Sequence, residues 1–246
     1  MKRTLLILLV GLTAAAAVFG SGPGGQALPT VDQILAKSVQ ATGGKAAIEK
    51  VTSAVSKGSF EIPAMGASGT AESYAKAPNK LLTIANIPGF GEIRQGFDGA
   101  TGWAQDPQTG LRDLSGGELW LAKREADLYK DLKYKTLYPK MTVSGKEKVG
   151  DREAYVIDAT PAGAAAEKLY FDTQTGLLIR RDFTAESPQG SFPAQEAYED
   201  YKAVDGVMVA FTTKLTLPQF GLVIKLSEVK HNVPVEDAQF LKPAAK

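Results

Sequence analysis

The sequence predicts a mainly β protein: a large antiparallel sheet of about eleven strands accompanied by helices. Three observations support this fold class. From Ser53 onward, apolar and polar residues alternate with a period of two, which is typical of half-buried strands. Turn residues interrupt this alternation at short, regular intervals, which favours hairpins over βαβ units. A sheet of this size must curl, close or be covered by the helices, because open edges promote aggregation.

The first helix is expected just after the start of the mature chain. Thr30 and Gln33 form a capping-box pattern, and Gly43-Gly44 should end the helix. A short second helix is expected over residues 45–50. The apolar stripe of the first helix consists of Val31, Ile34, Leu35 and Val39.

The strands fall into two groups, separated by a second helical region. The first group covers residues 54–62, 69–76, 80–86, 92–97 and 102–105. The second group covers residues 141–149, 152–159, a hairpin within 167–184, and then 198–204, 207–217 and 222–231. No shift in composition marks a linker, so residues 28–246 are read as a single domain.

The hairpin within residues 167–184 is the clearest of these predictions. Asp172 can accept hydrogen bonds from the backbone of its own turn, and Gly176 supplies the positive φ that the turn needs. The same chemistry occurs at residues 106–110. The match is either a weak internal repeat or a second use of one hairpin solution.

A second long helix is expected between the two groups of strands. Ser115 and Glu118 suggest a capping box, and the helix should run from Glu118 to about Tyr134. Its inward face would carry Leu121 and Leu128.

The charge balance argues against long-range electrostatic partners. The formal net charge is +1, and it becomes −1 without Lys2 and Arg3 (+1 − 2). Such a chain does not attract nucleic acid at a distance, so we expect no nucleic acid partner.

Residues 1–27 are typical of a signal peptide and its cleavage region. Lys2 and Arg3 precede an apolar run, small residues follow, and cleavage after Gly20 or Ala27 would fit. A membrane anchor is the alternative, although the run is short for a span of about 20 residues. From this leader we expect a protein exported to the periplasm. The chain has no cysteine, so its fold forms without disulfides.

The sequence offers little for catalysis or metal binding. His231 is the only histidine and has no nucleophile motif around it, so a structural role at a strand end is expected. One histidine and no cysteine exclude the common zinc arrangements, and we expect no cofactor. The carboxylates at Glu196, Glu199 and Asp200 are best explained by a solvated face or by ion pairs with Arg180 and Arg181. A hydrolase acting through carboxylates alone stays open.

Three connections carry aromatic residues that a closed core does not require. Ile87 and Phe90 lie on a Gly/Pro-rich segment, Phe192 lies near Pro193, and Phe220 follows Pro218. These residues could form an apolar rim or mouth, or their loops could fold onto the core.

Several of these features together resemble the periplasmic lipoprotein carriers and their relatives, the LolA/LolB-like superfamily. The resemblance rests on the leader, on the first helix with its Ala41-Thr-Gly-Gly44 end, on the segment from Tyr170 to Arg180, and on Tyr198-Glu-Asp-Tyr201 before Val204-Asp-Gly206. It implies a strongly curved, incompletely closed antiparallel β-barrel whose concave face is covered by helices. It also implies a hollow that accepts acyl chains. Arg94 is the candidate for the arginine with which the carrier holds its lid.

On this basis we expect a non-enzymatic, monomeric carrier of lipid or of acylated lipoprotein, with membrane-associated partner proteins. The alternative is an RseB-like sensor or protein-interaction module of the same fold. The residues predicted to line the cavity or its mouth are Leu35, Ile87, Phe90, Trp103, Trp120, Leu128, Phe192 and Phe220.

Overall fold

The computed structural model describes residues 27–187 and 190–244. The strands of the first half are β1 (Ser53–Ile62), β2 (Ala67–Lys76), β3 (Lys80–Ile87), β4 (Gly91–Phe97), β5 (Gly102–Asp106) and β6 (Gly110–Asp113). Those of the second half are β7 (Lys140–Val149), β8 (Arg152–Thr160), β9 (Glu167–Asp172), β10 (Leu178–Ser187), β11 (Gly190–Val204), β12 (Val207–Thr216) and β13 (Gly221–His231).

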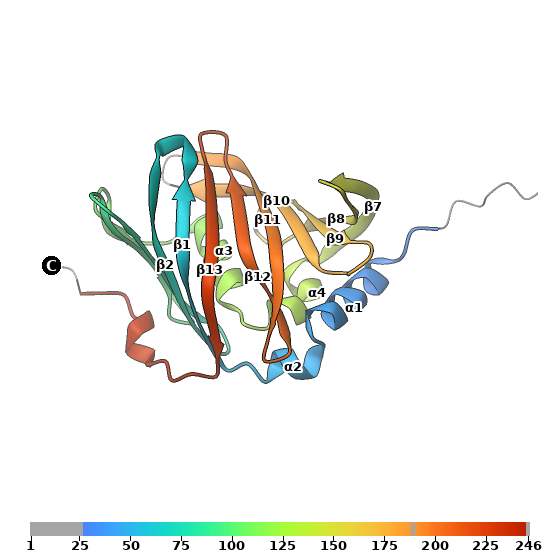
Figure 1. Cartoon of the computed structure of the whole chain (residues 1–246), viewed down its shortest axis with the longest axis horizontal. Helices are drawn as coiled ribbons and strands as arrows, with labels where there is room; N and C mark the ends of the chain where they lie inside the picture. Colours follow the sequence, from blue (N-terminus) through green and yellow to red (C-terminus); the bar gives the residue numbers. More distant parts are fainter. Residues whose placement is uncertain (1–26, 188–189, 245–246) are drawn as a thin grey trace, which may run out of the picture.

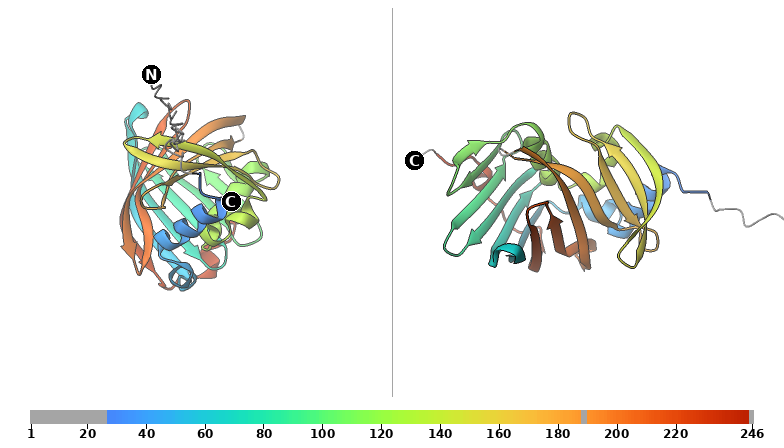
Figure 2. Two further views of the ribbon diagram at one scale, coloured as in Figure 1. Left: turned by 90° about the vertical axis from the view of Figure 1, so that its right-hand side faces the viewer. Right: turned by 90° about the horizontal axis from the view of Figure 1, so that it is seen from above.

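These strands form one antiparallel sheet of thirteen strands within the described residues, in the order β6-β5-β4-β3-β2-β1-β13-β12-β11-β10-β9-β8-β7. Two meanders are therefore joined by a single long-range pairing, between β1 and β13. The sheet is strongly curved and stays open, with β6 and β7 as its edges (Figure 1; Figure 2).

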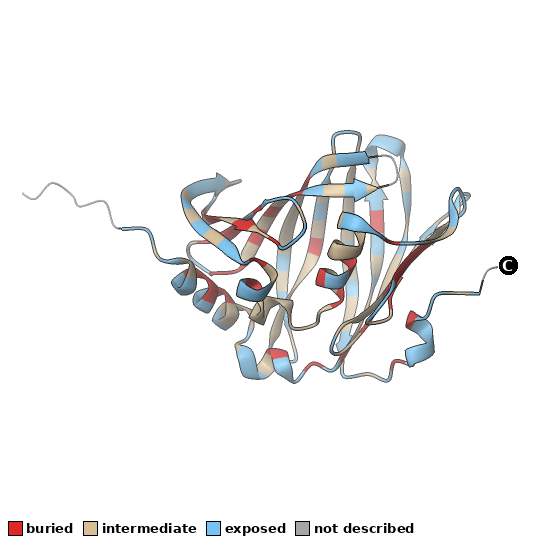
Figure 3. Cartoon of the chain, turned by 180° about the vertical axis from the view of Figure 1, so that it is seen from behind, coloured by how far each residue is buried: buried red, intermediate tan, exposed pale blue. Residues whose placement is uncertain are grey.

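The α-helices are α1 (Val31–Thr42), α2 (Lys45–Glu49), α3 (Gly116–Ala126) and α4 (Tyr134–Leu137), with 3₁₀ turns η1 (Pro63–Met65), η2 (Lys130–Leu132) and η3 (Asp237–Phe240). Helix α3 lies inside the curve of the sheet, where it contacts β3, β4, β5 and β10 (Figure 3). Helix α1 contacts β7 and β12. The helices therefore bridge strands that are far apart in the order of the sheet.

The predicted cap of the first helix and the predicted turns at Asp172 and Asp106 are confirmed. The Thr30 hydroxyl accepts a hydrogen bond from the Gln33 amide (3.3 Å), and the Gln33 side chain accepts one from the Thr30 amide (2.8 Å). Asp172 accepts hydrogen bonds from the amides of Gln174 and Thr175, and Asp106 does the same for its own turn. Shared turn chemistry thus recurs in separate hairpins of one sheet.

The predicted count of about eleven strands is too low. Residues 110–113, which follow the Asp106 turn, form the additional strand β6 along β5. Strand β11 begins at Gly190 rather than at Tyr198, so Phe192 lies in a strand and not in a loop. Pro193 cannot donate a hydrogen bond to the ladder, and it lies outside the part of β11 that pairs with β12, since that pairing starts at Gln195.

The predicted helix from Glu118 to about Tyr134 is too long, because α3 ends at Ala126. Asp127 adopts an extended conformation and its carboxylate accepts a hydrogen bond from the Tyr129 amide (2.9 Å). Such a local bond offers the backbone an alternative to the helix.

The predicted capping box of this helix is also wrong. Ser115 makes no side-chain cap hydrogen bond, and Glu118 instead binds Arg112 through two hydrogen bonds of 2.7 and 2.8 Å. The cap comes from another element: Glu186 of β10 accepts a hydrogen bond from the Gly117 amide (2.6 Å).

The two faces of the sheet are covered by different parts of the chain. On the concave side, Leu35 of α1 and Tyr134 and Tyr138 of the α4 region form a core with Leu169 and Phe171 of β9. The C-terminal segment packs on the opposite face of the first meander (Figure 1).

Trp103 anchors that C-terminal segment. Its indole Nε1 donates a hydrogen bond to the Phe240 carbonyl (2.9 Å), and both side chains are buried. Gly96 on the neighbouring strand makes room for the ring, since a Cβ there would lie 2.4 Å from the indole.

The predicted leader lies outside the described residues up to Gln26. Within residues 27–187 and 190–244, no helix combines the length and the apolar character needed to cross a bilayer.

Candidate ligand cavity

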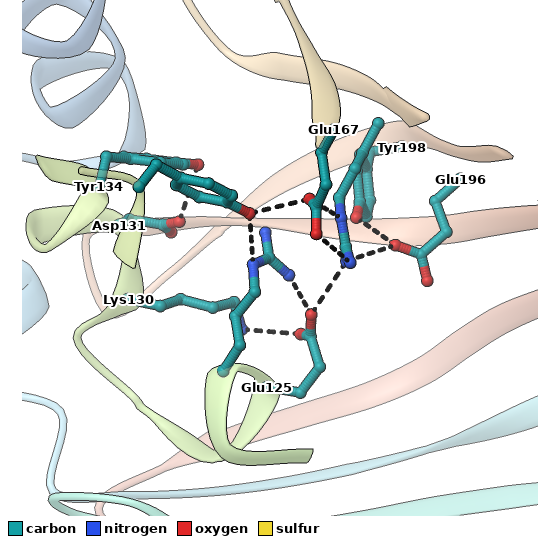
Figure 4. A network of polar contacts seen from close by, with 10 residues as sticks. Glu125, Lys130, Asp131, Tyr134, Glu167, Glu196 and Tyr198 are labelled. Carbon is teal, nitrogen blue, oxygen red and sulfur yellow. Dashed lines mark hydrogen bonds and ion pairs between the residues drawn. The ribbon is translucent and has the colours of Figure 1, made fainter. Parts of the chain in front are cut away.

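A cluster of buried and partly buried ionic side chains lies on the concave face of the second meander (Figure 4). At its centre is Arg181 of β10, which is fully buried. Its Nε donates a hydrogen bond to Glu167 of β9 (2.7 Å). Its Nη1 lies 3.3 Å from carboxylate oxygens of both Glu125 and Glu196. One guanidinium therefore joins three carboxylates from α3, β9 and β11.

A register irregularity between Leu178 and Arg180 helps to place this arginine. Ile179 packs in a separate cluster with Val156 and Tyr170, whereas Arg181 faces α3. Regular alternation would have put Ile179 and Arg181 on the same face.

The helical connection contributes a second layer to the cluster. Arg124 Nε donates a hydrogen bond to the Tyr138 hydroxyl (3.0 Å), which in turn donates to Glu167 (2.9 Å). Arg124 also pairs with Glu125, and Lys130 Nζ lies 3.3 Å from the other oxygen of Glu125. Helix α3 is thus fixed to β9 and β10 by charged contacts.

Burial and charge act in opposite directions on Glu125. Burial favours its neutral form, but Lys130, Arg124 and Arg181 outweigh that effect and hold the pKa of Glu125 well below its ordinary value. Burial also raises the pKa of the Tyr138 hydroxyl. At neutral pH the carboxylate is therefore charged and the phenol remains a hydrogen-bond donor.

The charges of the cluster balance, and its charged groups bind one another. Three cations, Arg124, Lys130 and Arg181, face three carboxylates, Glu125, Glu167 and Glu196. Among the described residues, no group of three or more His, Cys, Asp or Glu side chains is arranged to hold a metal ion. This arrangement suits the role of a clamp between helix and sheet.

A cavity of about 310 Å³ lies beside this clamp. Helices α1 and α2, the inner faces of β1, β12 and β13, and the segment that follows α3 enclose it. This volume is at the small end of the range for ligand sites. Its apolar wall includes Ile48, Val51, Leu128, Leu178, Met208 and Val229, and its polar wall includes Lys130, Asp131, Tyr134, Tyr198, Tyr201 and His231.

His231 is the most unusual member of the polar wall. Its side chain is 5% exposed, and its Nδ1 makes no hydrogen bond and lies 3.6 Å from Asp205. Burial lowers the pKa of His231 and outweighs the opposite effect of Asp205. The imidazole is therefore neutral at pH 7. The expected position at a strand end is confirmed, and the side chain faces the cavity.

Above the cavity the concave face becomes apolar. Ala54 and Ser56 of β1 line the cavity, so the alternate residues Phe60 and Ile62 share their face. Ile224 lies directly opposite Phe60 in the pairing with β13. In the other direction, the same face continues through Ala71, Ala85 and Ile93 on β2, β3 and β4. Most of these side chains are only partly buried.

Three of the predicted lining residues lie at the cavity or on this face. Leu128 lines the cavity. Ile87 ends β3 two residues beyond Ala85, and by alternation it shares the inner face. Phe192 pairs with Ala185 on β10, four residues from Glu196 of the clamp, which also faces inward.

Two more lie at the end of the sheet. Phe90 is exposed in the β3–β4 turn, and Phe220 is half-buried in the β12–β13 turn. Both therefore lie near the rim of the sheet rather than within the cavity.

The remaining three lie elsewhere. Leu35 is part of the core beneath α1. Trp120 of α3 packs edge-to-face on Tyr138, with ring centroids 6.2 Å apart. Trp103 lies on the convex face, where the C-terminal segment covers it. Successive residues of its strand alternate between the two faces, and the position of Trp103 faces outward.

Sequence reasoning identified only part of the clamp. For the carboxylates Glu196, Glu199 and Asp200 we expected either a solvated face or ion pairs with Arg180 and Arg181. The ion pair is found for Glu196, which binds Arg181. Glu199 instead pairs with Lys214, and Arg180 pairs with Asp182. Arg94, the candidate lid arginine, instead pairs with Glu92 on its own strand (2.9 Å). The roles of Glu167 and Arg124 could not be read from the sequence, because their partners are distant in the chain and no local spacing marks them.

Comparison with known proteins adds evidence on the fold. No protein-family model matches the sequence, and no curated protein matches it. Solved structures do match. A DUF1329 family protein from Desulfovibrio piger aligns with a TM-score of 0.60 at 16% identity, covering 86% of this chain and 97% of the other.

Two further structures align over nearly their whole length. A LolA superfamily protein from Nitrosomonas europaea aligns with a TM-score of 0.58 at 16% identity, covering 87% of this chain and 99% of the other. A putative outer membrane lipoprotein-sorting protein domain from Vibrio parahaemolyticus aligns with a TM-score of 0.56 at 13% identity, covering 85% and 96%. At these identities the likeness is one of fold.

Proposed function

Starting from this fold of LolA superfamily proteins, we propose that the protein is a periplasmic carrier for the acyl chain of a lipid or of an acylated protein. The chain would lie in the cavity beside the clamp and along the apolar inner face of the sheet. The observation that carries this proposal is the cavity of about 310 Å³ with its apolar wall.

Hydrophobic burial is sufficient for such binding. Each methylene removed from water contributes about 0.8 kcal/mol, so ten of them contribute roughly 8 kcal/mol before the costs of ordering. No catalytic group is needed. The lipoprotein-sorting description of the Vibrio relative is compatible with this class of ligand.

The polar wall suggests how the ligand would be oriented. The acyl chain would contact Leu128 and the inner-face residues Ile87 and Phe192. Its polar end would face Lys130 and His231 at the other side of the cavity. In this proposal the mature chain, residues 28–246, acts as a monomeric single domain.

A cavity-filling substitution tests the proposal. Ala210 lines the cavity on β12, so Ala210→Trp should weaken uptake of a fluorescent fatty acid by about tenfold or more, because the indole occupies the volume of the ligand. Thr216→Trp is the matched control, since Thr216 is exposed on the same strand. It should bind as the unchanged protein does.

Circular dichroism and urea unfolding establish that both variants fold. Equal uptake by the two folded variants would contradict the proposal. If the unchanged protein takes up no fatty acid, the alternative function, a sensor or protein-interaction module of the same fold, becomes the better hypothesis.

A further inference from the structure

Three neighbouring hairpin tips at one end of the sheet lack charged residues. The segments are residues 62–71 at β1–β2, 81–91 at β3–β4 and 215–224 at β12–β13. In a chain with 22% charged residues, each is a long neutral run. Each tip also presents an apolar side chain: Met65 is 69% exposed, Phe90 is 38% exposed, and Phe220 is half-buried.

The order of the sheet places these tips side by side. Strands β4-β3-β2-β1-β13-β12 are consecutive, and their hairpins turn at the same end, which is the upper end in Figure 1. Neighbouring strands are about 4.8 Å apart, so neighbouring tips are separated by about 10 Å. The result is a row of separate apolar anchors.

The charges just behind the row neutralise one another. Glu61 on β1 pairs with Lys225 on β13 (3.9 Å), and Glu92 on β4 pairs with Arg94 (2.9 Å). The row therefore carries no excess of positive or negative charge. A partner recognised by charge, such as an acidic or basic protein surface, does not complement it.

From these observations we propose that this row, which we define as Met65, Phe90 and Phe220 with their charge-free tips, docks on the interface of an electrically neutral lipid bilayer. The tips lack the charged residues that usually contribute to the polar rim of a protein interface. A bilayer interface can admit each apolar side chain separately, and aromatic side chains are favoured at that depth.

Sedimentation with phosphatidylcholine vesicles tests the proposal on the mature chain, with no fatty acid added. The unchanged protein should bind. The double variant Met65→Ser/Phe90→Ser should bind about tenfold more weakly, because two anchors are lost. Raising the salt from about 0.1 to about 0.5 M should change binding less than about twofold.

Leu241→Ser is the control, since Leu241 is 57% exposed but lies on the C-terminal segment. It should bind as the unchanged protein does. Absence of binding, an equal loss in the control, or binding only to anionic vesicles that salt abolishes would each overturn the proposal. Because the vesicles carry no added fatty acid, this result is separate from the uptake test of the cavity.

Discussion

Arg181 shows how a single buried charge can be tolerated inside this sheet. Its guanidinium is fully buried and contacts carboxylates of three elements. Desolvating a charge is costly unless its partners are well placed. Burial and Arg124 disfavour the charged form, but the carboxylates outweigh them and raise the pKa of Arg181. The cluster should therefore specify where α3 sits on the sheet.

Replacing this arginine should destabilise the fold strongly. Arg181→Met retains much of the side-chain volume but leaves Glu167 buried without its cation. Breaking a buried pair in this way costs about 3–5 kcal/mol. Urea unfolding monitored by tryptophan fluorescence measures the loss.

Arg94→Met serves as the comparison, because Arg94 pairs with Glu92 on β4 and both side chains are partly exposed. Exposed pairs contribute about 0–1 kcal/mol. If Arg181→Met costs no more than Arg94→Met, the cluster is not the clamp described here.

Residue-level prediction from the sequence succeeded for two features whose chemistry is local. The Thr30–Gln33 capping box and the Asp172 turn each depend on residues within four positions of one another. The contacts of Arg181 with Glu167 and Glu125 span 14 and 56 positions. No local pattern encodes such distances, so those roles became visible only in the folded chain.

At the scale of elements, the helices show where tertiary contacts override propensity. The Ser115–Glu118 pattern favoured a local cap, yet Glu118 binds Arg112 and the cap comes from Glu186. Both of these partners, Arg112 and Glu186, lie outside the helix. Apolar periodicity also could not separate α3 from the turns that follow, because Leu128 faces the cavity although it lies beyond the helix.

The C-terminal segment is a second element whose role depends on tertiary contacts. Phe240 is fully buried against Trp103, so Phe240→Ala should destabilise the protein by about 3–5 kcal/mol through the cavity it leaves. Thermal or urea unfolding checks this value.

The adjacent Leu241 supplies the internal control. It is exposed, so Leu241→Ala should change stability by less than about 0.5 kcal/mol. Similar effects of the two substitutions would show that the segment does not cover the convex face as described.

At the scale of the whole molecule, alternation predicted the strands but not how the two faces are used. Trp103 and Phe97 lie on neighbouring strands, and both are buried. Yet Trp103 packs beneath the C-terminal segment, whereas Phe97 lines a small hollow with Leu121 of α3. A period of two separates the faces without saying which one is concave. The packing of α3 on one face and of the C-terminal segment on the other shows which face is concave.

The cavity and the apolar face above it are consequences of that curvature. An open, curved sheet with a helix clamped inside it leaves space that its own side chains do not fill. In our account this space is where the acyl chain binds.

The most direct measurement is lipid extraction from protein purified without detergent from its native host, followed by mass spectrometry. We predict a co-purifying acyl-chain lipid in an amount comparable to the protein, and its depletion in the folded Ala210→Trp variant. Lipid-free protein that also stays empty after incubation with lipid would contradict the account.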